Sequence, residues 1–285
     1  MLFYEIIKSI VLGIIEGITE WLPVSSTGHI ILFDEILPLD ASDAFKDMFF
    51  VVIQLGAIAA VCVTFFNKLN PFSRRKTEAE RKGTWSLWLK VIVGVLPAGL
   101  LGLIIEACFD DFFSTYMEHY SVIAAALIIY GILFIVLESI PRKKGYRVNS
   151  VEELTFADAL KIGAFQTLSL IPGTSRSGST FIGGMLTGVS RKVTAEFSFF
   201  MAIPLMLAAS GLKVLKFFFD GNTFSSQEIV ILCIGTVVSF AVSMFAIRFL
   251  MSFVSRHDLK AFGYYRIGLG VVVIGYFVIR GVILA

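Results

Sequence analysis

Two hydrophobic stretches of this chain are broken near their middle by short polar segments, and this pair of breaks limits the available folds. The first break, within 5–37, reads "L-P-V-S-S-T-G-H", and the second, within 156–190, reads "I-P-G-T-S-R-S-G-S-T". Half-helices joined by an irregular turn leave backbone groups unpaired, and lipid offers those groups no partner. We therefore expect both stretches to form re-entrant helical hairpins that are enclosed by protein.

The rest of the chain has the composition of a membrane protein. Of its 285 residues, 56% are hydrophobic and only 16% are charged, whereas soluble domains carry about 25% charged residues. Apolar runs of about 20 residues, long enough to cross a bilayer, lie at about 48–66, 85–106, 120–141, 193–217, 228–252 and 262–284. The sequence predicts an all-α integral membrane protein with six transmembrane helices plus the two hairpins. This composition makes membrane lipids the expected surroundings and partners, and a net charge of +2 is too small to suggest nucleic acid as a partner.

Three short patterns recur about 150 residues apart and predict an internal repeat. They are Gly13-x-x-Glu16 with Gly163-x-x-Gln166, Phe49-Phe50-x-x-Ile53-x-Leu55 with Phe199-Phe200-x-x-Ile203-x-Leu205 and, after a one-residue slip, Pro23-x-Ser25-Ser26 with Pro172-x-Thr174-Ser175. We expect a single membrane domain over 1–285, with one repeat over about 1–141 and the second over about 142–285. Three spans separate the hairpins, so the second copy is inverted, as in many transporters.

Ionisable and hydroxyl side chains crowd the first break. Glu16 and Glu20 are four residues apart and share one helix face, where a cation or a shared proton would offset their repulsion. The alternative is a pair that reaches the interface or is hydrogen-bonded within the bundle. Ser25, Ser26 and Thr27 lie where a half-helix begins, a position that suits an anion or, more simply, a helix cap.

Three further charged or titratable residues belong to these regions. His29 lies beside the carboxylates and hydroxyls, as a site member or as a satisfied buried imidazole. Arg176 lies in a glycine- and hydroxyl-rich turn that resembles a phosphate cradle; its counter-anion is a substrate phosphate or one of the two glutamates. Arg266 lies just inside the last apolar run, where snorkelling explains it as well as a second phosphate contact does.

Together, "E-G-I-T-E-W-L-P-V-S-S-T-G-H" (16–29) and "P-G-T-S-R-S-G" (172–178) closely resemble the motifs of the undecaprenyl-pyrophosphate phosphatases, also called bacitracin-resistance proteins. The resemblance spans essentially the whole chain. It implies hydrolysis of a C55 polyprenyl diphosphate lipid to its monophosphate and inorganic phosphate in the bacterial plasma (inner) membrane. That reaction recycles the lipid carrier for peptidoglycan synthesis and confers resistance to bacitracin.

The resemblance also implies site residues and a cofactor, a divalent cation that is either Mg²⁺ or Ca²⁺, with Glu16 and Glu20 as its ligands. The implied catalytic residues are Glu16, Glu20, Ser26, His29 and Arg176. The implied substrate-binding residues are Ser25, Thr27, Ser175, Thr180 and Arg266. The site is expected to open outward, and a homodimer is one of the assemblies that the sequence leaves open.

The attacking group and the rival function also follow from these residues. Ser26, His29 or a water held by them could attack the diphosphate, and we favour Ser26, with His29 or Glu20 taking its proton. The rival is an inverted-repeat transporter or flippase of an anionic or lipid-phosphate substrate. A carrier needs phosphate ligands but neither a nucleophile nor a base, so the cluster around Ser26 distinguishes the two.

Loop charges predict the orientation of the chain. The 67–84 loop carries six basic residues and the 142–147 loop carries four, whereas 107–119 and 218–228 carry none. Because basic loops stay in the cytoplasm, both termini are expected outside, with the first hairpin entering from outside and the second from the cytoplasm.

Cysteine accessibility tests this orientation in intact cells. A cysteine placed in the 218–228 loop should react with a membrane-impermeant thiol reagent, and one in the 67–84 loop should react only after the membrane is opened. The reverse pattern would contradict the predicted topology.

Overall fold

The computed structural model describes residues 2–109, 112, 116, 117, 119–141 and 145–284. These residues form helices, with one isolated parallel bridge between Val148 and Val189. Three members of the second basic loop, Arg142, Lys143 and Lys144, and part of the 107–119 loop lie outside the described residues.

Six helical segments are long and apolar enough to cross a membrane, which confirms the predicted number of spans. The first is formed by α3 (Asp43–Val52) and α4 (Gln54–Thr64), followed by the one-turn α5 (Phe66–Leu69). The others are α6 (Glu78–Cys108), α8 (Tyr120–Ser139), α11 (Arg191–Phe219), α12 (Ser226–Arg256) and α13 (Lys260–Leu284). Helix α6 begins well before the predicted apolar run at 85 because a polar first turn with a capping box at Thr77 extends it.

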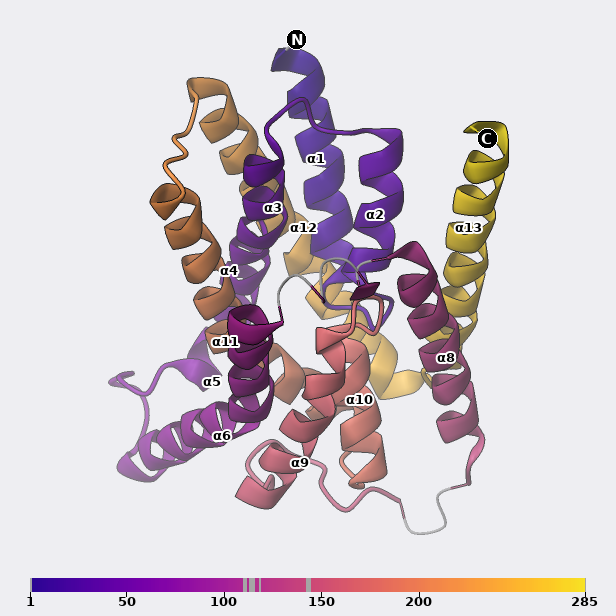
Figure 1. Ribbon diagram of the computed structural model, residues 1–285. Helices are drawn as coiled ribbons and strands as arrows, with labels where there is room; N and C mark the ends of the chain where they lie inside the picture. Colours follow the sequence, from indigo (N-terminus) through magenta and orange to yellow (C-terminus); the bar gives the residue numbers. More distant parts are fainter. Residues whose placement is uncertain (1, 110–111, 113–115, 118, 142–144, 285) are drawn as a thin grey trace.

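The two broken stretches form helical hairpins whose turns meet near the middle of the bundle (Figure 1). In the first, α1 (Leu2–Thr19) descends from the end that carries both termini and α2 (Ser26–Ile36) returns to it. In the second, α9 (Phe156–Gln166), the 3₁₀ turn η2 (Thr167–Leu170) and α10 (Arg176–Leu186) occupy the opposite half. Entry of each hairpin from its own side of the membrane stays a prediction.

The returning helices begin in the same way, and this corrects the sequence alignment of the repeats. Ser25 and Ser175 are the two described non-glycine residues with positive φ, 74° and 71°. Each caps its helix by accepting a hydrogen bond from a glycine amide three residues later, Gly28 or Gly178. Ser25 therefore corresponds to Ser175 at an offset of 150, and the predicted one-residue slip is wrong, because cap geometry and not the proline fixes the turn.

Each hairpin packs against the other repeat. Helix α1 makes its most extensive contacts with α12, and α9 makes its own with α6. Small residues allow the close approach: a Cβ on Gly163 would lie 2.0 Å from the carbonyl oxygen of Gly94, and one on Gly13 would lie 2.7 Å from that of Gly235. The two halves of the chain are interlocked, so neither hairpin has its main packing surface within its own half of the sequence.

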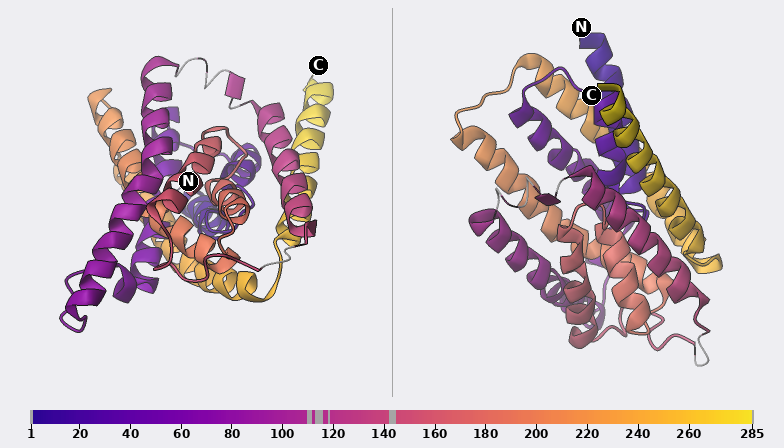
Figure 2. Two further views of the ribbon diagram at one scale, coloured as in Figure 1. Left: turned by 90° about the horizontal axis from the view of Figure 1, so that it is seen from below. Right: turned by 45° about the vertical axis from the view of Figure 1, so that its right-hand side comes forward.

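The two ends of the bundle differ in the way that the loop charges predict. The start of α1, the end of α13 and the α11–α12 connection lie at one end, and α5 and the start of α6 lie toward the other (Figures 1 and 2). Seen along the bundle, α9 and α10 lie inside a surround of longer helices (Figure 2, left). Gly173 and Thr174 in the turn of this hairpin are buried, whereas Leu168 and Ile171 before them are exposed, so the protein encloses only part of the turn.

Gly163→Ala should destabilise the protein because the added methyl group would collide with the α6 backbone at Gly94. We expect a loss of about 1–3 kcal/mol in the free energy of unfolding, measured as a lower melting temperature in detergent. Gly275→Ala on α13 is the matched control, since a Cβ there meets nothing within 4 Å, and it should keep or raise the melting temperature. Equal melting temperatures for the two variants would contradict the close α6–α9 packing.

Candidate active site

Arg266 holds the two hairpin turns together. Its guanidinium is fully buried, donates to the carbonyl oxygen of Pro23 in the first turn at 3.2 Å, and donates to those of Gly173 and Thr174 in the second at 2.8 and 3.0 Å. It also lies over the Tyr130 ring, 5.5 Å from the centroid. The snorkelling alternative is wrong for this residue, because the arginine is the link between the half-helices.

An ion pair crosses from one turn to the other. Arg176, the first residue of α10, donates from Nε to Oε1 of Glu20 at 3.2 Å, and its Nη2 lies 3.2 Å from the same oxygen without making a hydrogen bond. The second carboxylate oxygen, Oε2, accepts a hydrogen bond from Ser26, the first residue of α2, at 3.2 Å. Glu20 thus lies between a guanidinium and a hydroxyl that both belong to helix N-termini.

Ser198 on α11 fixes the other side of the guanidinium. Arg176 Nη1 donates to the Ser198 carbonyl oxygen at 2.8 Å and lies 3.2 Å from its hydroxyl. Thr180 donates to that hydroxyl at 2.7 Å, and the Arg176 guanidinium lies 5.8 Å from the centroid of the Trp21 ring. Arg176 is held in place from two helices while Nη2 keeps unused donors.

His29 has a hydrogen-bond partner at both ring nitrogens, and neither partner is the Ser26 hydroxyl. Its Nδ1 lies 2.7 Å from the carbonyl oxygen of Ser25, and its Nε2 lies 2.7 Å from the Tyr265 hydroxyl. A carbonyl oxygen can only accept, so Nδ1 carries the proton and, in the neutral ring, Nε2 accepts from the tyrosine. The structure therefore brings Glu20, and not His29, to the Ser26 hydroxyl.

A cavity of about 570 Å³ opens beside this ion pair. Five of the sequence-predicted residues line its polar part: Glu20, Ser26, Thr27, Ser175 and Arg176. Its apolar walls come from α6 between Val95 and Glu106 and from α11 between Pro204 and Leu212. Arg176 is the one basic side chain among the described residues of the lining, so an anion that enters would meet it.

Glu16 lies apart from the cavity lining and is fully buried. Both of its carboxylate oxygens lack a hydrogen-bond partner, which is costly for a buried charge unless a proton or cation is present. Within the described residues no three acidic, histidine or cysteine side chains form a metal cage. Two adjacent carboxylates still fit Mg²⁺, which usually binds one or two carboxylates, substrate phosphates and water.

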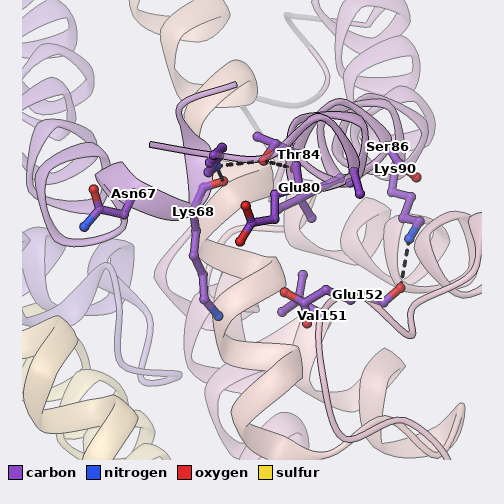
Figure 3. A pocket seen from close by; sticks show the side chains of 12 residues that line it. Asn67, Lys68, Glu80, Thr84, Ser86, Lys90, Val151 and Glu152 are labelled. Carbon is purple, nitrogen blue, oxygen red and sulfur yellow. Dashed lines mark hydrogen bonds between the residues drawn. The ribbon is translucent and has the colours of Figure 1, made fainter. Parts of the chain in front are cut away.

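A second hollow of about 470 Å³ lies near the start of α6 and is lined by several lysines (Figure 3). Lys68 pairs with Glu196, Lys76 donates to the Thr84 hydroxyl, and Lys90 donates to the Glu152 carbonyl oxygen. Its three ammonium groups already have acceptors, so we place the candidate site at the hairpin turns.

Four other predicted residues do not line the cavity: Ser25, His29, Thr180 and Arg266. Ser25 and Ser175 are helix caps, and only Ser175 also faces the cavity. Sequence reasoning missed Ser198, Tyr265 and Trp21, which hold Arg176 and His29. Two of the three could have been suspected from the sequence because they adjoin predicted site residues: Tyr265 directly precedes Arg266, and Trp21 directly follows Glu20.

Comparison with known proteins gives a consistent result. The family described as "Bacitracin resistance protein BacA" matches residues 9–272. Proteins named undecaprenyl-diphosphatase are similar over nearly the full length. One from Enterococcus faecalis is 51% identical, covering 97% of this chain and 99% of its own length. One from Desulfitobacterium hafniense is 51% identical over 99% of this chain and all of its own, and one from Acetivibrio thermocellus is 52% identical over 96% and 98%.

Arg266→Lys should separate the two turns, because one ammonium group cannot reach carbonyls in both of them. We expect a loss of about 2 kcal/mol or more in the free energy of unfolding, read from thermal unfolding in detergent. Arg280→Lys is the control on the same helix, since Arg280 forms a partly exposed ion pair with Glu35, and such pairs contribute about 0–1 kcal/mol. A melting temperature of Arg266→Lys that equals the control's would contradict the bridging role.

Proposed function

The chain belongs to the bacitracin resistance protein BacA family, and from this we propose that it hydrolyses undecaprenyl diphosphate to the monophosphate and inorganic phosphate. The reaction recycles the lipid carrier for peptidoglycan synthesis, and raised activity confers bacitracin resistance. The observation that carries the proposal is the cavity in which Ser26, Glu20 and Arg176 meet beside apolar walls.

The cavity suits a lipid with a diphosphate head. Its polar part lies at the hairpin turns, and its apolar walls on α6 and α11 include leucines that are also exposed on the outside of the bundle. Leu96, Leu100, Leu103 and Leu212 are each between 43% and 57% exposed. A prenyl chain lying between α6 and α11 would pass from the cavity to the membrane interior, while the diphosphate stays at the turns.

Arg176 binds the phosphate to be transferred. Its Nη2 has no hydrogen-bond acceptor, and a guanidinium binds phosphate oxygens through two parallel hydrogen bonds. The α10 N-terminus adds its partial positive charge on the same side. Positive charge held at this position stabilises the negative charge on the transferred phosphoryl group.

Ser26 supplies the attacking oxygen. Its Oγ donates to Glu20 Oε2, so the proton passes to that carboxylate while Oγ bonds to the terminal phosphorus. The bond between this phosphorus and the bridging oxygen breaks, and the prenyl monophosphate leaves with the electron pair. Water then hydrolyses the phosphoserine, releasing inorganic phosphate and restoring the hydroxyl, with the Glu20 proton returned to the serine oxygen. His29 holds the Ser25 carbonyl and thereby the start of α2.

Glu16 and Glu20 would hold the divalent cation, Mg²⁺ or Ca²⁺. The support is the unpartnered carboxylate of Glu16, one helical turn before Glu20. Such an ion neutralises charge on the diphosphate oxygens and on the two carboxylates.

A transporter or flippase is the second candidate, favoured by the interlocked hairpins. A carrier would need Arg176 but has no use for a serine hydroxyl held on a carboxylate, so we assign hydrolysis. We propose that the protein lies in the plasma membrane with both termini and the cavity mouth on the outer side.

Phosphate release tests this function. The purified protein in detergent should release inorganic phosphate from undecaprenyl diphosphate, and EDTA should suppress the release. Arg176→Lys should lower kcat/KM by about 100-fold or more while the protein still folds, because the two-pronged contact is lost. Transport of the intact diphosphate without phosphate release would favour the carrier, and near-normal turnover of Arg176→Lys would remove that residue from the site.

A further inference from the structure

Gln54 is a polar residue in the wall of the cavity. It has no role in the proposed hydrolysis. It is the first residue of α4, directly after Ile53, where the first membrane span is interrupted between α3 and α4. The position that corresponds to it in the second repeat is Pro204, which lies within α11 and lines the same cavity. Helix α11 continues through Pro204, so only the first repeat interrupts a membrane span at this level and places an amide there.

The hydrogen bonds around the cavity distinguish Gln54 from its polar neighbours. Glu20, Ser26, Ser175 and Arg176 all have side-chain partners in the structure. Thr27 has none among the described residues, but it is exposed. Gln54 is half-buried and forms no side-chain hydrogen bond with the described residues. A half-buried amide that faces a cavity gains most when a ligand there provides acceptors, since an unmet donor in such a place is costly.

We propose that Gln54 binds the diphosphate of the substrate by donating from its amide nitrogen to a phosphate oxygen, and so contributes to substrate affinity. This inference rests on the proposed function for the identity of the ligand. An amide suits the position because it donates without adding a second positive charge to the cavity that Glu20 and Arg176 line. Gln54 approaches from the α4 wall, whereas Arg176 approaches from the second turn, so the two donors hold the head group from different elements.

The test separates binding from turnover. The affinity of the detergent-purified protein for a non-hydrolysable farnesyl methylenediphosphonate is measured by calorimetry, and phosphate release from farnesyl diphosphate is measured in parallel. Gln54→Leu and Gln54→Met remove the amide with little change in size, and Gln54→Glu replaces the donor with a carboxylate. Thr64→Val on the same helix is the control, because Thr64 lies outside the cavity and contacts Met244.

Gln54→Leu and Gln54→Met should weaken binding of the phosphonate about 10- to 100-fold, the range for a hydrogen bond to a charged group. In the same two variants KM for farnesyl diphosphate should rise, and the factor by which it rises should exceed the factor by which kcat falls. Gln54→Glu should weaken binding further, and Thr64→Val should bind as the wild type does. Affinities within twofold of wild type for both apolar variants, in proteins with unchanged melting temperatures, would overturn the assignment.

The two measurements also separate this inference from the proposed function. If the wild type binds the phosphonate without releasing phosphate, hydrolysis fails, and the assignment of Gln54 is still decided by the affinities. If the wild type releases phosphate and the variants bind normally, the inference alone fails. A wild-type protein that neither binds nor hydrolyses would overturn both.

Discussion

The guanidinium of Arg266 is the contact on which the centre of this bundle depends. Two hairpins that end inside the protein present carbonyl groups that no helix can satisfy, and one side chain from α13 binds such groups in both turns. Because five donors in a rigid plane can reach different elements at once, the distance between the turns is fixed. That distance in turn determines how close Glu20 lies to Arg176 and to the Ser26 hydroxyl.

Two residues that line the same cavity hold equivalent positions at the starts of α2 and α10 but differ in chemistry. Ser25 and Ser175 cap their helices with the same unusual backbone, and the next residue is Ser26 in one repeat and Arg176 in the other. Both of these side chains line the cavity. A hydroxyl and a guanidinium therefore converge from opposite halves of the chain, with Glu20 between them. The shared geometry of the two helix starts brings the side chains together, and the different residues after the caps give them different chemistry.

Much of this arrangement could be predicted from the sequence because its signals are local. Runs of apolar residues predicted the six spans, and Pro, Gly and hydroxyl residues marked both breaks. Contacts between distant segments left no such signal: neither Ser198 beneath Arg176 nor Tyr265 on His29 belongs to a motif. The role of Arg266 was missed for the same reason, since its acceptors are backbone oxygens, which every residue has. The offset between the two turns was wrong because the alignment matched Pro23 with Pro172, whereas the caps Ser25 and Ser175 determine the correspondence.

The interlocked packing has a consequence for biosynthesis. Helix α1 is made long before its main partner α12, which begins only at Ser226. At translation rates of about 5–20 residues per second, roughly 10–40 seconds pass before that surface exists. Over this interval the buried carboxylates of α1 have no completed interior to enter, and insertion machinery or chaperones must shield them from lipid. Such late, long-range closure slows folding, so the nascent first half is the state in which this protein is most exposed to quality-control proteolysis.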